Sequence, residues 1–207
     1  MRTSFLILLS LLMVSCTAVT PSAVQVVNVY ATGGARPWLE EMYACAEIAG
    51  AALNLTAESP QIQLRLGEPE DWKGAIYQVG TEEIVVAAQL QSPLGSLTLT
   101  QANEIFSGKG NPSVQVWAYA AGDDVQRAFD RLVMNGRSVT SFARLAATPM
   151  HMSASLTADI NAIGFLPRRW MTGELKELFA AGSVPVLALT PSEPEGIARD
   201  LLACMRK

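Results

Sequence analysis

Histidine and cysteine are scarce in this sequence, which bears on several classes of site. His151 is the only histidine, and the three cysteines are Cys16, Cys45 and Cys204. They form no cluster with the spacing of zinc or haem ligands. The sequence therefore predicts no metal site and no cofactor.

Charged residues are also few, and no basic patch is visible. They make up 16% of the chain, with a net charge of −4. A nucleic-acid surface needs clustered Lys and Arg, so no nucleic-acid partner is expected. No period of 20 to 50 residues repeats, which excludes solenoid folds.

Features that would indicate an enzyme are missing as well. There is no Gly-x-Ser-x-Gly nucleophile motif and no convincing Ser/His/Asp set. The carboxylate pairs at 40–41 and 82–83 are adjacent in sequence, so their side chains do not share one face. We expect a protein that is not an enzyme.

The N-terminus has the pattern of an export signal. Arg2 precedes an apolar run at 5–14, which is followed by Ser15 and Cys16. The run is too short to span a bilayer as a mature helix. Residues 12–16, Leu-Met-Val-Ser-Cys, resemble a bacterial lipobox, which predicts a signal peptide at 1–15, a lipidated Cys16 and a polar tether up to residue 23. An ordinary signal peptide with an incidental cysteine is the alternative.

Export changes the interpretation of Cys45 and Cys204. Outside the cytoplasm a disulfide can persist, and closing so long a loop would stabilise the fold by about 4 to 5 kcal/mol in the chain-entropy model. Two buried free thiols are the alternative, because the sequence does not show whether the geometry permits a bond.

An anion-binding loop is predicted near the N-terminus of the mature chain. Residues 24–30 are rich in β-branched side chains and predict a buried strand, and Pro37 then suits the first turn of a helix whose apolar face extends to Leu53. Between them, Thr32, Gly33 and Gly34 would offer a hydroxyl and accessible N–H groups at the helix N-terminus. A glycine-permitted turn without a ligand is the alternative.

Strand and helix patterns alternate along the remaining chain, which predicts a layered α/β fold with largely parallel sheets. Two stretches within it are more specific. Residues 97–108 read Leu-Thr-Leu-Thr-Gln-Ala-Asn-Glu-Ile-Phe-Ser-Gly, a helix capped by Thr98 or Thr100 and stopped by Gly108. Residues 162–165 read Ala-Ile-Gly-Phe after a short amphipathic run. Both stretches resemble the PstS-like, phosphate-type solute-binding proteins of ABC importers.

The resemblance implies a two-lobed periplasmic-binding-protein-like fold of type II. Lobe 1 would comprise residues 24–90 and 184–207, and lobe 2 residues 91–183. The expected function is an exported, lipid-anchored protein, in the periplasm or on the outer face of the cytoplasmic membrane, that binds a small oxyanion such as phosphate in an interlobe cleft. The expected partners are that solute, an ABC permease and the membrane.

The same resemblance implies the ligand-binding residues. Thr32, Gly33 and Gly34 occupy the place of the family's first ligand loop. The region that carries the family's second set of ligand contacts is shorter in this chain, and Gly80 and Thr81 are the candidate contacts that remain there. Thr140 and Ser141 would cap a helix at 142–147 that faces the cleft.

Residues 122–125, Gly-Asp-Asp-Val, depart from the family pattern. Phosphate-binding relatives carry an arginine and a Ser-Gly-Thr cradle at this junction, whereas this chain has two carboxylates. Asp123 and Asp124 are interpreted as an N-cap and a residue that compensates the helix dipole. A phosphate beside unpaired carboxylates would be repelled by several kcal/mol. The alternative function is therefore a degenerate binding-fold lipoprotein that acts as a sensor or protein-interaction module without a transported ligand.

Overall fold

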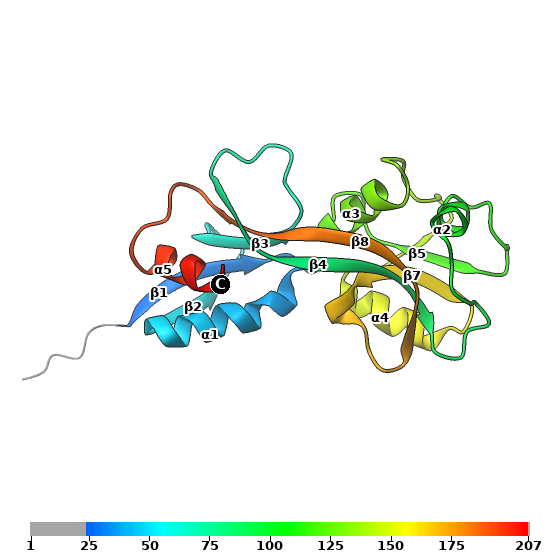
Figure 1. The fold of residues 1–207 in the computed structure, drawn as a ribbon, viewed down its shortest axis with the longest axis horizontal. Coiled ribbons are helices and arrows are strands. Elements are labelled where there is room, and N and C mark those ends of the chain that lie inside the picture. Colours follow the sequence, from blue (N-terminus) through cyan, green and yellow to red (C-terminus); the bar gives the residue numbers. More distant parts are fainter. Residues whose placement is uncertain (1–23, 207) are drawn as a thin grey trace, which may run out of the picture.

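The computed structural model describes residues 24–206, which form one mixed eight-stranded sheet with helices packed against it (Figure 1). The predicted signal peptide, Cys16 and the tether lie outside the described residues. The strands are β1 (Gln25–Ala31), β2 (Ala51–Leu55), β3 (Ile62–Leu66), β4 (Ala75–Gln89), β5 (Gln115–Ala118), β6 (Arg144–Leu145), β7 (Ala162–Pro167) and β8 (Leu175–Thr190). The helices are α1 (Leu39–Ala49), α2 (Leu99–Phe106), α3 (Asp124–Leu132), α4 (Pro149–Ala158) and α5 (Gly196–Met205), with short 3-10 turns η1 (Arg36–Trp38) and η2 (Arg168–Trp170).

The sheet has the strand order β2-β1-β3-β8-β4-β7-β5-β6. Pairing is parallel at its two ends, between β1 and β2, β1 and β3, β5 and β6, and β5 and β7. The middle is antiparallel, with β8 between β3 and β4 and with β4 also paired to β7. The expected α/β class is confirmed, and the sheet is mixed. The expectation that it is largely parallel fails at the centre, where β3, β8, β4 and β7 pair antiparallel.

Two long antiparallel strands, β4 and β8, run through the middle of the molecule and connect its two halves (Figure 1). We call β1, β2, β3, α1 and α5 lobe 1, and we call β5, β6, β7, α2, α3 and α4 lobe 2. Both lobes share β4 and β8, so the residue boundaries at 90/91 and 183/184 stay a prediction. Among residues 24–206, no helix is both long enough and apolar enough to cross a bilayer.

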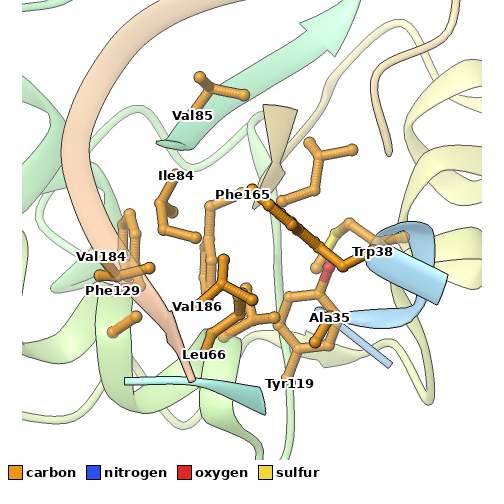
Figure 2. Close-up of a cluster of buried hydrophobic side chains, with 14 of the residues drawn as sticks. Ala35, Trp38, Leu66, Ile84, Val85, Tyr119, Phe129, Phe165, Val184 and Val186 are labelled. Atoms are coloured by element: carbon orange, nitrogen blue, oxygen red, sulfur yellow. The ribbon is translucent and has the colours of Figure 1, made fainter. Parts of the chain in front are cut away.

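The hydrophobic core is continuous between the lobes. Phe165 of β7 stacks on Phe129 of α3 with 3.8 Å between ring centroids, and Phe106 of α2 meets both rings edge-on. Figure 2 shows Ala35, Trp38 and Leu66 of lobe 1 in the same buried cluster as Tyr119, Phe129 and Phe165 of lobe 2. The lobes therefore meet through apolar side chains as well as through β4 and β8.

Residues 142–147 do not form the expected helix. Arg144 and Leu145 form β6 and pair with β5, and the next helix, α4, begins only at Pro149 with Thr148 as its N-cap. The Thr148 hydroxyl accepts from the His151 N–H, and proline fits the first turn because its missing N–H has no helical partner. The prediction that Thr140 or Ser141 caps a helix is therefore wrong.

The structure contains a disulfide between Cys45 on α1 and Cys204 on α5, with the two Cα atoms 5.8 Å apart. The two cysteines are 159 residues apart in sequence. The bond joins the helix after the first strand to the last helix of the chain. It therefore closes lobe 1, whose elements come from both ends of the described sequence.

Candidate anion site between the lobes

The centre of the candidate site is the carboxylate of Asp124 at the start of α3. Asp123 is the N-cap, and its Oδ1 accepts from the Val125 N–H at 2.8 Å. Because Asp123 already fills this role, Asp124 is free to point elsewhere. Its side chain turns into the protein, and the residue is only 4% exposed.

Two donors from lobe 1 converge on one oxygen of this carboxylate. The hydroxyl of Thr32, directly after β1, donates to Asp124 Oδ2 at 2.5 Å. The backbone N–H of Leu66, at the end of β3, donates to the same oxygen at 2.8 Å. Hydrogen bonds to a buried carboxylate are stronger than those between neutral groups. Asp124 thus joins lobe 2 to two strands of lobe 1.

Glycines allow the loop after β1 to reach α3 and α4. A Cβ on Gly34 would lie 2.6 Å from Val125 Cγ2 and 3.2 Å from Asp124 Oδ1. A Cβ on Gly33 would lie 3.0 Å from Pro149 Cδ at the start of α4. This close packing explains why residues 33 and 34 have no side chains. The loop lies directly against both helix N-termini.

The second oxygen, Asp124 Oδ1, is buried and has no hydrogen-bond partner among residues 24–206. A buried acceptor without a partner is destabilising by about 1 to 3 kcal/mol. The hydroxyl of Tyr119, also buried, is likewise unpaired within the described chain. We call this contact between Asp124 and the ends of β1 and β3 the junction. It has a few polar atoms in an otherwise apolar environment.

A buried arginine contributes positive charge to the site. Arg65 is 7% exposed on β3, and its Nε donates to the Gly67 carbonyl at 3.1 Å. Burial lowers the pKa of Arg65, and the negative charge of Asp124 acts in the opposite direction. Arg65 therefore places a positive charge on the lobe 1 side, close enough to interact with the Asp124 carboxylate.

Burial also disfavours the charged forms of two neighbouring acids. It raises the pKa of Asp123, and the charge of Asp124 raises it further. Burial raises the pKa of Tyr119 well above its usual range, with added contributions from Asp123 and Asp124. The site therefore resists any further negative charge beyond that of Asp124.

Asp130, one helical turn beyond Gln126 on α3, gives a testable pH dependence. Burial raises its pKa, although its carboxylate accepts from Gln126 Nε2 at 2.9 Å. The folded protein then binds this proton more tightly than the unfolded chain, so the Asp130 contribution to stability falls as pH rises from the unfolded pKa to the folded one. We expect Asp130→Asn to gain stability relative to the wild type between about pH 3 and pH 7.

Urea unfolding of both proteins across this pH range measures the effect. Asp200→Asn, on the exposed surface of α5, controls for the change in net charge. If the difference in the free energy of unfolding between wild type and Asp130→Asn does not change with pH, the pKa of Asp130 is not raised in the folded protein.

A second contact between the lobes surrounds Trp38. Its indole N–H donates to Glu82 Oε2 at 2.9 Å, and Glu82 is 3% exposed. Arg169 of η2 lies over the Trp38 ring at 4.0 Å and forms ion pairs with Glu41 at 2.6 Å and with Glu82 at 3.5 Å. We call Trp38, Glu41, Glu82 and Arg169 the latch, because it ties α1 and β4 to η2.

Arg169→Ala is expected to destabilise the fold by about 2 to 3 kcal/mol. The change removes the cation–π contact and leaves the buried Glu82 carboxylate without a positive partner. Arg168→Ala is the matched control, because Arg168 pairs with Glu83 and Glu177 at an exposed position and such pairs contribute about 1 kcal/mol or less. Equal losses in urea unfolding for the two variants would contradict the proposed role of Arg169.

The seven predicted ligand residues fall into three separate places. Thr32, Gly33 and Gly34 lie at the junction. Gly80 lies beneath Trp38, where a Cβ would be 2.1 Å from the indole ring, and Thr81 is an exposed residue of β4. Thr140 and Ser141 line a cavity of about 240 Å³ within lobe 2, together with Tyr119, Gln126 and Asp130.

Sequence reasoning missed the contributions of Leu66, Arg65 and Pro149, and it interpreted Asp124 only as part of the capping and dipole compensation of a helix. A backbone N–H such as that of Leu66 leaves no signal in a sequence. Two consecutive aspartates, of which one suffices as an N-cap, were the available hint for Asp124. Within residues 24–206, no three His, Cys, Asp or Glu side chains are grouped so as to hold a metal ion.

No protein-family model matches the sequence, and no curated protein sequence matches it. Solved structures do match. A candidate phosphate ABC-transporter substrate-binding protein from Clostridium perfringens, with bound phosphate, has a TM-score of 0.74 at 15% identity, over 87% of this chain and 93% of that one. An ABC-type phosphate transport receptor from Vibrio cholerae has a TM-score of 0.63 at 13% identity, over 87% and 93%. The CcmR regulatory domain of Synechocystis PCC6803, in complex with 2-PG, has 0.67 at 12% identity, over 88% and 96%.

The fold is that of the type II periplasmic-binding proteins. At these identities the likeness concerns the fold alone. Proteins with the type II fold in this comparison include both transport receptors and a regulatory domain. The function of this chain must therefore be argued from the residues of its own junction.

Proposed function

We propose that this chain is an exported, lipid-anchored solute-binding protein of an ABC importer, and that its solute is a small oxyanion, such as phosphate, held between the lobes. The observation that carries the proposal is the convergence of the Thr32 hydroxyl and the Leu66 N–H on one carboxylate oxygen of the opposite lobe. Two donors that converge on one point favour an oxygen acceptor there, and they bind an anionic oxygen more strongly than a neutral one. The type II fold of the phosphate-transport proteins above supports the same function.

The donors of the junction suit an oxyanion that takes the place of the Asp124 carboxylate, but not one that binds in addition to it. Hydroxyl and backbone N–H donors bind an anion without a paired counter-charge, and the N-terminus of α3 adds a partial positive charge. Arg65 supplies a full positive charge nearby. One anionic oxygen is well accommodated, and Asp124 currently provides it.

The second candidate is a lipoprotein that acts as a sensor or protein-interaction module without a transported ligand. Asp124 favours it, because its carboxylate already occupies the donor position and is almost fully buried. The apolar core that continues from Ala35 and Trp38 to Phe165 also favours lobes that stay together.

A thermal-shift screen of the mature chain, residues 16–207, tests the first candidate. Phosphate, sulfate, molybdate and small organic anions would be added in turn. A ligand at 100 times its dissociation constant stabilises by about 2.7 kcal/mol, a shift of several degrees for a protein of this size. A saturable shift with one anion, lost in Thr32→Val, supports transport. No shift with any of them favours the second candidate.

Export and anchoring need a separate experiment, since residues 1–23 lie outside the described structure. We expect the intact chain to be recovered in the membrane fraction and to incorporate labelled fatty acid. Cys16→Ser is expected to abolish labelling. If the variant is labelled as strongly as the wild type, Cys16 is not the lipidated residue.

A further inference from the structure

We propose that Asp124 is a built-in occupant of the anion site, which fills the oxyanion position from within and competes with any free anion. This inference rests on the proposed function, since it requires that Thr32 and Leu66 form an oxyanion site. It goes beyond that function by naming Asp124 as the residue that sets the affinity of the site. No solute can use these two donors unless the Asp124 carboxylate leaves.

Only one anionic oxygen fits against the two donors. The Thr32 hydroxyl and the Leu66 N–H are 2.5 and 2.8 Å from the same atom, Asp124 Oδ2. The carboxylate is buried at 4% exposure, and a Cβ on Gly34 would already lie 3.2 Å from its other oxygen. A free oxyanion and the Asp124 carboxylate therefore cannot occupy this position together.

Ordinary helix capping does not explain the position of Asp124. Asp123 already caps α3 through the Val125 N–H at 2.8 Å. A capping or dipole-compensating carboxylate is normally solvated, whereas Asp124 Oδ1 is buried without a partner among residues 24–206. Local helix stability does not require that arrangement. Occupation of an anion site by a tethered carboxylate accounts for it directly.

A carboxylate attached to the chain competes strongly with a free anion. Such a group binds its own site with an effective concentration in the millimolar range or above. A free anion must displace that group before it reaches the two donors. Like-charge repulsion further opposes entry while Asp124 stays nearby. Removal of the carboxylate should therefore strengthen anion binding by about tenfold or more.

The chemistry of the Asp124 side chain also defines the best probe for a variant that lacks it. An aspartate side chain is an acetate ion attached to the backbone, so Asp124→Gly removes the equivalent of one acetate. Free acetate should then restore the two hydrogen bonds in the variant. Acetamide has the same size but no charge, and it should not replace acetate.

The experiment compares the wild type, Asp124→Gly and the matched control Asp123→Gly, all as the mature chain, residues 16–207. Calorimetry and thermal shift at constant ionic strength follow acetate, phosphate and acetamide. We expect acetate and phosphate to bind Asp124→Gly at least tenfold more tightly than the wild type, and acetate to raise its Tm saturably. Asp123→Gly should behave like the wild type. If Asp124→Gly does not fold, Asp124→Ser provides the same comparison with a smaller backbone effect.

The outcomes separate this inference from the proposed function. Phosphate binding to the wild type that equals binding to Asp124→Gly overturns the inference and leaves the transport function standing. No anion binding to either protein overturns both. Anion binding to Asp124→Gly but not to the wild type supports the inference that Asp124 occupies the site. It also argues against transport of a free oxyanion by the wild type.

Discussion

Loss of the Cys45–Cys204 disulfide is expected to reduce the free energy of unfolding by about 3 to 5 kcal/mol. The bond closes a loop of 159 residues in sequence, almost the whole described chain. In the chain-entropy model a loop of this length stabilises by about 5 kcal/mol, and removal of native disulfides typically costs about 2 to 5 kcal/mol. The expected decrease in Tm is about 10 °C.

The measurement is urea unfolding of the wild type with and without reductant, beside the double variant Cys45→Ala/Cys204→Ala. Alanine suits both positions because Cys45 is buried on α1 and Cys204 is half-buried on α5. The reduced wild type and the double variant should unfold at the same midpoint. A change of less than about 1 kcal/mol on reduction would show that the bond contributes little in solution.

Gly80→Ala is expected to destabilise by about 3 to 5 kcal/mol, although it adds a single methyl group. A Cβ at this position would lie 2.1 Å from Trp38 Cη2 and 2.2 Å from Cζ3. The indole cannot move aside easily, because it is hydrogen-bonded to Glu82 and covered by Arg169. Overpacking costs about 1 to 3 kcal/mol, and loss of a hydrogen bond to a charged group adds about 1.5 to 3 kcal/mol.

Gly95→Ala is the control for Gly80→Ala, because a Cβ there meets no atom within 4 Å. Equilibrium unfolding of both variants measures the difference, and the total tryptophan fluorescence, to which Trp38 contributes, is expected to change only in Gly80→Ala. If the two variants are equally stable, Trp38 does not pack on Gly80 in solution.

The α/β class was accessible from the sequence because strands and helices differ in the period of their apolar residues. The extent of the central strands was not. The apolar runs at 84–88 and 184–189 predict only short strands. In the structure β4 and β8 extend further, because Gly80 and Gly182 lie at irregularities of the ladder instead of ending it. Pro185 is tolerated in the central strand β8 because the β3 ladder stops at Val186, one residue away.

Helix ends were predicted less well than helix positions. The apolar pattern of α1 extends to Leu53, but Gly50 has a φ of 66° and ends the helix, and residues 51–55 form β2. The sequence left Thr98 and Thr100 as alternative caps of α2, and the structure shows Thr98 as the N-cap, in a capping box with Gln101. A helix cap can be predicted from the sequence when all of its residues lie within a few positions of one another.

The site could be predicted only in part for the same reason. The loop at 32–34 carries a local signal, since glycines and a hydroxyl precede a helix. The role of Asp124 depends on partners 58 and 92 residues away, so it arises only when the two lobes meet. Thr140 and Ser141 were misplaced because a turn and a short strand replace the expected helix.

A double-mutant cycle between Thr32 and Asp124 is the most direct test of the central claim that Asp124 holds the lobes together at an anion position. Thr32→Val, Asp124→Ala and the double variant would be unfolded in urea under identical conditions. A buried charged hydrogen bond predicts a coupling energy of about 1 to 3 kcal/mol. Additive effects, with coupling below about 0.5 kcal/mol, would mean that the two side chains do not interact and would contradict this claim.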